Sequence, residues 1–245
     1  MKTILGLSMR PALFALCCCA LAACSQKPPA ADWALNAESA ADRATQAYLK
    51  ADQRVQALEW SKARAEVERT ASPQLLARLA LMRCAVEHAS LQWEGCSEYQ
   101  ALAIDADPPE QAYALYLQAA AMAPQAIALL PEAQQAVARA GDAKAALAAV
   151  QAIKAPLSRL LAASMALRAH GPTAGLLAEA VDTAAGQGWR RPLLAWLLLS
   201  VREARRRGDE DQAQRMERRV QVLQGQMRPG PQHSTTPAAS ANALP

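Results

Sequence analysis

The sequence predicts an all-α protein, and three observations carry this prediction. Alanine and leucine dominate a chain of 245 residues that is 52% hydrophobic, and both residues favour helices. Residues with β-branched side chains are too thinly spread for an extensive sheet. Capping residues, prolines and glycines recur at short breaks between apolar segments, as they do at successive helix ends.

Helices are expected one after another along the chain. Their expected ranges are 34–50, 53–70, 73–91, 97–106, 109–122, 126–140, 143–154, 156–170, 173–187, 190–207 and 209–224. The breaks before 73 and 109 carry strong signals, because Ser72-Pro73 and Asp107-Pro108 place a capping side chain before a proline. Glu110 is expected to complete a capping box with Asp107.

The helix expected at 73–91 has two apolar faces. One face carries Leu75, Leu79, Met82, Val86 and Ala89, and the nearly opposite face carries Leu81, Cys84, His88 and Leu91. Such a helix is packed from both sides, as in a layered helical array. The helix at 209–224 has a single stripe, made of Ala213, Met216, Val220 and Leu223, and is expected to be a terminal cap.

The later breaks are regularly spaced. Gly141-Asp142, Gly171-Pro172 and Gly208-Asp209 lie 30 and then 37 residues apart, and each joins a helix-ending glycine to a helix-starting residue. The segments "ARAGDAKAALAAV" and "ARRRGDEDQAQRMERRV" align around Gly-Asp, and "YLKADQRVQALEW" is a looser copy. These segments resemble the turn of a tetratricopeptide repeat, although the Trp, Leu-Gly and Tyr residues typical of its first helix are missing. The resemblance implies an α-hairpin array, a TPR-like solenoid, over 34–224; an irregular helical domain is the alternative.

The N-terminus has the three parts of a bacterial export signal. Lys2 and Arg10 give it positive charge, an apolar run from 12 to 23 follows, and "LAAC" at 21–24 ends it. This run is too short to span a bilayer. The four residues resemble the lipobox of bacterial lipoproteins, with a plain secretory signal as the alternative.

The lipobox resemblance implies a domain order and a location. Residues 1–23 are the signal peptide, Cys24 is the lipid attachment site with palmitate-like acyl chains, and residues 24–33 are a short tether. Ser25, in place of Asp, resembles an address for the outer membrane, so a lipid-anchored protein facing the periplasm is expected. Residues 225–245 are rich in Pro, Ser, Thr and Ala and are expected to be a disordered tail.

Charge and motifs exclude several classes of function. After removal of 1–23 the chain has 24 basic and 22 acidic residues, a balance that argues against nucleic-acid binding. No Gly-rich phosphate loop, G-x-S-x-G or H-E-x-x-H occurs. We therefore expect neither an enzyme nor a cofactor; an enzyme whose site is assembled from scattered residues is a minor alternative. The arginines of 202–219 are interpreted as a solvated helix face, and an anionic partner is the alternative.

Cys84 and Cys96 are the two cysteines that remain once Cys24 is lipidated and the signal is removed. An even pair in an exported chain is expected to form a disulfide, and Gly95 allows the chain to reverse between the two positions. Two buried free thiols are the alternative. His88 shares a helix face with Cys84, so Cys84, His88 and Cys96 offer three metal ligands, but no fourth ligand of usual spacing follows. No metal site is expected.

The leading interpretation is a non-enzymatic protein-interaction or scaffold module of the cell envelope, with an unidentified envelope protein as partner. The alternative is an accessory factor that binds or activates a peptidoglycan enzyme. This interpretation follows from a resemblance of the chain to helical-repeat lipoproteins that act in outer-membrane assembly or pilus biogenesis.

Overall fold

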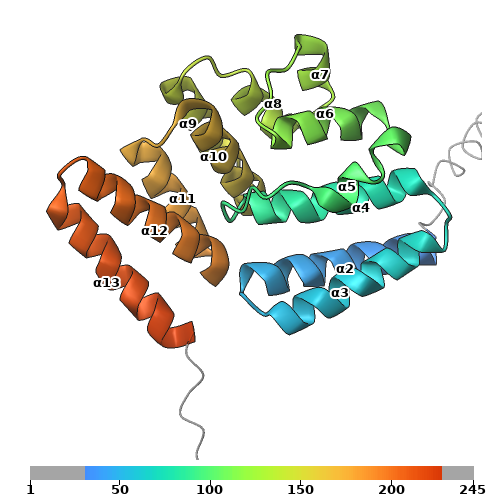
Figure 1. Ribbon diagram of the computed structural model, residues 1–245, viewed down its shortest axis with the longest axis horizontal. Coiled ribbons are helices and arrows are strands. Elements are labelled where there is room, and N and C mark those ends of the chain that lie inside the picture. The colour runs from blue at the N-terminus through green and yellow to red at the C-terminus, as the bar shows by residue number, and fades with distance from the viewer. Residues whose placement is uncertain (1–30, 228–245) are drawn as a thin grey trace, which may run out of the picture.

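The computed structural model of the chain describes residues 31–227 (Figure 1). Regular secondary structure in this range is helical throughout and contains no strand, so the prediction of an all-α protein is confirmed. The helices are α2 (Asp32–Leu49), α3 (Gln53–Glu68), α4 (Pro73–His88), α5 (Ser97–Gln100), η2 (Ala103–Asp105, a 3₁₀ helix), α6 (Pro108–Leu117), α7 (Pro124–Ala128), α8 (Glu132–Ala138), α9 (Ala143–Ala152), α10 (Pro156–His170), α11 (Ala174–Gly186), α12 (Arg190–Arg206) and α13 (Glu210–Met227).

The helical region begins and ends slightly outside the range expected from the sequence. Asp32 opens α2 inside the expected tether, and α13 continues to Met227, inside the expected tail. Cys24, the tether up to residue 30 and the tail from residue 228 lie outside the described residues.

Several helix ends use the capping side chains that the sequence indicates. Ser72 accepts a hydrogen bond from the backbone N–H of Leu75 at 3.2 Å, and Asp142 accepts one from Ala145 at 2.8 Å. At the other end, Gly171 follows α10 in a left-handed conformation with φ of 81°. Glycine adopts that conformation without the steric cost that a Cβ atom imposes.

Two expected helices are each divided. The range 126–140 contains α7 and α8, separated at Pro131; proline lacks an N–H donor and disfavours a helical residue before it. The range 97–106 contains only α5 and η2, because the hydrogen bonds tighten to three-residue steps, as from Asp105 to the Leu102 carbonyl. The helix expected at 109–122 is shorter than predicted. Its counterpart α6 ends at Leu117, and Ala119 then takes a positive φ of 55°.

The expected capping box at the start of α6 is wrong. The side chain of Asp107 makes no capping hydrogen bond. Glu110 is turned away from the helix start, and its Oε1 accepts a hydrogen bond from Nε of Arg78 on α4 at 2.6 Å. A tertiary ion pair has replaced the local interaction.

The helix α4 is covered on both sides, as its two apolar faces predict. It packs against α2 and α3 on one side and against α5, α6 and α10 on the other (Figure 1). The final helix, α13, packs its single stripe against α12 and lies at the edge of the molecule.

Residues far apart in the sequence join the early and late helices. Nε1 of Trp196 on α12 donates to the Ala89 carbonyl after α4 at 3.1 Å. Nε of Arg191 donates to the Tyr48 carbonyl at 2.9 Å, and its guanidinium lies 4.4 Å from the centre of the Tyr48 ring. In an open solenoid each repeat contacts only its neighbours. Here the two halves contact each other as well, through α2 with α12 and α4 with α10.

Candidate functional site

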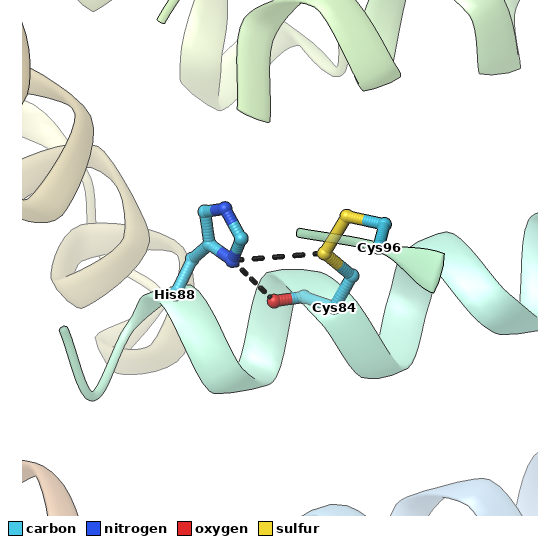
Figure 2. A group of neighbouring side chains, drawn as sticks. All are labelled: Cys84, His88 and Cys96. Carbon is cyan, nitrogen blue, oxygen red and sulfur yellow. Dashed lines mark hydrogen bonds between the residues drawn. A yellow bond between two sulfur atoms is a disulfide. The ribbon is translucent and has the colours of Figure 1, made fainter. Parts of the chain in front are cut away.

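The loop that joins α4 to α5 brings Cys84 and Cys96 together. Cys84 is in the last turns of α4, and Cys96 is the residue before α5. Their Cα atoms are 5.6 Å apart and their sulfurs are joined (Figure 2), a separation within the 4.4–6.8 Å range of disulfides. Gly95, with φ of 71°, allows the chain to reverse just before Cys96. The geometry is therefore compatible with the disulfide expected from the sequence.

His88 lies directly beside this pair. Its Nδ1 is 2.9 Å from the Cys84 carbonyl oxygen and 3.6 Å from Cys84 Sγ (Figure 2). A carbonyl oxygen only accepts, so Nδ1 is the protonated nitrogen of this contact. Burial lowers the pKa of His88, an effect opposed by the carbonyls of Cys84 and Leu117. Burial therefore favours the neutral imidazole.

A hollow of about 330 Å³ opens against Cys96 and His88. Arg168 of α10 lies at its edge, where it donates to the carbonyls of Leu117 and Gln118 and lies 5.6 Å from the centre of the Trp93 ring. Nε1 of Trp93 in turn donates to Ser164 at 2.9 Å. The Trp93 contacts fasten the loop after α4 to α10, and the Arg168 hydrogen bonds fasten the end of α6 to α10.

Two arginines at the end of α12 pair with acids of α12 and α13. Arg206 binds Glu203 at 2.7 Å, and Arg205 binds Glu217 across the helix pair. This local pairing favours the interpretation as a solvated helix face.

A larger and mainly apolar cavity lies between α4, α6, the α7–α8 turn and α10. Its volume is about 510 Å³, within the size range of small-molecule and side-chain pockets. Apolar side chains form most of its wall: Leu81, Met82, Ala85, Val86, Pro109, Leu129, Leu130, Pro131, Leu157 and Leu161. Leu129 is at the rim and remains 44% exposed.

Hydrogen-bonded polar groups occur at two parts of this cavity wall. At the first, the exposed side chain of Arg78 forms an ion pair with Glu110, a residue that is only 8% exposed. At the other, Gln134 accepts from the Tyr116 hydroxyl at 2.8 Å and donates to the Ser158 carbonyl at 3.0 Å. Such an arrangement fits an apolar group and offers a charged pair at the opening.

The sequence did not reveal this cavity, because four separate elements build it. One feature of the sequence, a proline, indicated part of the cavity wall. Pro131 interrupts the expected helix 126–140, and the turn that it imposes places Leu129 and Leu130 against α4 and α6 instead of continuing one helix.

The chain matches no protein-family model, and comparisons with curated proteins and with solved structures found no match. Within residues 31–227, none of the helices has both the length and the apolar character needed to cross a membrane.

Proposed function

We propose that this protein is a lipid-anchored, non-enzymatic interaction module of the cell envelope. Cys24 would attach it to the outer membrane, with the helical domain facing the periplasm. The lipobox resemblance at 21–24 supports the anchor, and the short distance from Cys24 to Asp32 would hold the domain close to the membrane surface.

The helical domain is proposed to descend from TPR-like helix pairs. Successive pairing of α10 with α11, α11 with α12 and α12 with α13 supports this, as does the Gly208-Asp209 turn between the last two helices. The contacts between α2 and α12 would then have curled the array.

The cavity between α4, α6, α7–α8 and α10 is the proposed partner-binding site, and it is the observation that carries the function. It is open, it is lined mainly by aliphatic side chains, and its wall contains neither histidine nor cysteine. An apolar side chain or loop of an envelope protein would bury its surface there, at about 25 cal/mol per Å². The exposed Arg78 guanidinium at the opening would contact a polar flank of that segment.

Site-specific photo-crosslinking in intact cells tests this proposal. A photoreactive apolar residue replaces Leu129 at the rim, and the same residue replaces Val222, which is 64% exposed on distant α13, as a matched control. A discrete crosslinked product from position 129, absent from position 222, is the expected result. Filling the cavity with Ala85→Phe should abolish that product while the protein keeps its helical content.

The identity of the captured protein separates the two interpretations of the sequence. An assembly or structural protein of the envelope supports a scaffold role. A peptidoglycan synthase or hydrolase supports the alternative, an accessory factor of a cell-wall enzyme. Equal crosslinking from positions 129 and 222, or capture unaffected by Ala85→Phe, would contradict binding in this cavity.

A further inference from the structure

We propose that Cys84, His88 and Cys96 form a binding site for one thiophilic closed-shell cation, Cu⁺ or Zn²⁺, when the disulfide is reduced. The two sulfurs and a nitrogen of His88 all lie within 4.8 Å of one another, and Figure 2 shows the ring beside the sulfur pair. Soft thiolates with one imidazole are the ligand set that Cu⁺ and Zn²⁺ select.

The helix α4 already holds two of these ligands at the separation that a metal requires. Cys84 and His88 are one turn apart, at i and i+4, so their side chains project from the same face. Cys84 Sγ and His88 Nδ1 are 3.6 Å apart. With bonds of about 2.3 Å to sulfur and 2.0–2.1 Å to nitrogen, a tetrahedral ion separates two such ligands by about 3.5 Å. No helix rearrangement is needed for this half of the site.

Cys96 is the ligand that must move. Two thiolates on one tetrahedral ion lie about 3.8 Å apart, farther than two bonded sulfurs. Cys96 lies in the chain reversal after Gly95 rather than inside a helix, so a change in its side-chain torsion and a small shift of this loop supply the difference.

His88 must also release Nδ1 from its contact with the Cys84 carbonyl. Its remaining proton then resides on Nε2, and the N–H can donate a hydrogen bond to the Leu117 carbonyl, the other backbone acceptor at this ring. Ligating histidines normally donate their second nitrogen to such an acceptor.

Metal loading takes place in two steps, reduction of the disulfide and then binding of the ion. A dithiol reductant supplies two electrons and two protons: the Cys84–Cys96 bond breaks, each sulfur gains a hydrogen, and the reductant becomes a disulfide. Binding of the cation then displaces both thiol protons to solvent. Loading therefore requires prior reduction and releases protons in a measurable ratio.

The hollow beside the proposed site allows the metal ion to enter, and a nearby arginine affects the electrostatics of the site. The hollow of about 330 Å³ against His88 and Cys96 gives a path for the ion and room for a water as fourth ligand of Zn²⁺; Cu⁺ needs no fourth ligand. Arg168, the cationic group lining this hollow, opposes the metal charge but stabilises the two thiolates.

The test uses the purified exported chain, reduced with a phosphine and desalted without oxygen. Zn²⁺ and Cu⁺, each against a competing chelator, are titrated into wild type, His88→Gln, Cys84→Ser and His170→Gln. His170 at the end of α10 is the matched control histidine. Co²⁺ serves as a spectroscopic probe, because thiolate ligation produces a charge-transfer band.

Reduced wild type should bind one ion with release of two protons, and the oxidised protein should bind none at this site. His88→Gln should weaken binding at least tenfold, Cys84→Ser should abolish it, and His170→Gln should leave it unchanged. If reduction lowers the helical content, one equivalent of metal should restore it. Failure to restore it, equal binding by wild type and Cys84→Ser, or an unaltered affinity in His88→Gln would overturn the proposal. The two affinities show which ion the reduced site selects.

Discussion

At the scale of single residues, the Cys84–Cys96 pair should be oxidised if the protein is exported as proposed. The bridge closes a loop over a sequence separation of 12 residues, which stabilises the fold by about 3 kcal/mol in the chain-entropy model. Intact mass before and after reduction should differ by two hydrogen atoms. Urea unfolding of the double variant Cys84→Ala with Cys96→Ala should show a loss of about that free energy.

A fully reduced exported chain would contradict the oxidised pair. Alkylation without reduction provides the control, because a disulfide leaves both cysteines unmodified. Equal stability of wild type and the double variant would show that the bridge adds nothing to the fold.

Tyr48 should make stability depend on alkaline pH. Burial raises the pKa of Tyr48 to about 12, an effect partly offset by the charge of Arg191. Because the folded-state pKa exceeds the unfolded value near 10, the neutral phenol's contribution is complete below pH 10 and is lost as pH rises to about 12. The unfolding free energy of wild type should fall by about 2–3 kcal/mol more than that of Tyr48→Phe across this range.

Gln92→Ala is the matched control for this titration. Gln92 accepts the hydrogen bond of the Tyr48 hydroxyl at 2.8 Å, so the variant loses the bond but keeps the ionising group. It should retain the alkaline loss of stability. Parallel pH profiles for wild type and Tyr48→Phe would rule out Tyr48 as the source.

At the scale of helices, local signals predicted ends well and interiors less well. Ser72 and Asp142 cap the helices that follow them because a cap needs only an N–H three residues away. Glu110 has the spacing for a capping box, yet it pairs with Arg78, 32 residues away in the sequence. Sequence spacing describes neighbours within one helix, and it carries no information on a charged partner brought close by packing.

Asp209 should anchor the start of α13. Its Oδ1 accepts from the backbone N–H of Gln212 at 3.0 Å, and loss of such a cap costs about 1 kcal/mol. Asp209→Ala should lower the free energy of unfolding by that amount and increase amide exchange in the first turn of α13. Asp211→Ala removes a first-turn acid without this bond and should cost less. Equal losses in both variants would assign the effect to the helix dipole alone.

At the scale of the whole molecule, contacts between the halves lay beyond the reach of the sequence. The two apolar faces of 73–91 predicted a helix covered on both sides, but they did not identify α10 as a partner. The cavity is likewise defined only when α4, α6, α8 and α10 are assembled. Repeat spacing favours an open array, whereas Trp196 and Arg191 join segments more than 100 residues apart.

Trp196 should couple the two halves into one cooperative unit. It is fully buried, and its Nε1 donates to the Ala89 carbonyl. Trp196→Phe leaves a void and an unpaired buried carbonyl, for an expected loss of about 2–4 kcal/mol. Trp93→Phe also loses one indole hydrogen bond, to Ser164, but at a partly exposed position, so its loss should be smaller. Unfolding monitored by far-ultraviolet circular dichroism and tryptophan fluorescence compares the variants, and equal losses would contradict a central role for Trp196.

The whole protein should partition with membranes through Cys24. Several acyl chains on one cysteine, at about 0.8 kcal/mol per buried CH₂, give an anchor that does not dissociate, whereas the described helices provide no membrane span. Cys24→Ala should therefore move the protein from the membrane to the soluble fraction of the envelope or block its processing, as seen by fractionation and by loss of labelling with a palmitate analogue. Ser25→Asp keeps the lipid and should shift the protein from outer to inner membrane on a density gradient, which tests the address separately from the anchor. Full membrane retention of an unlabelled Cys24→Ala protein would show that another part of the chain holds it there.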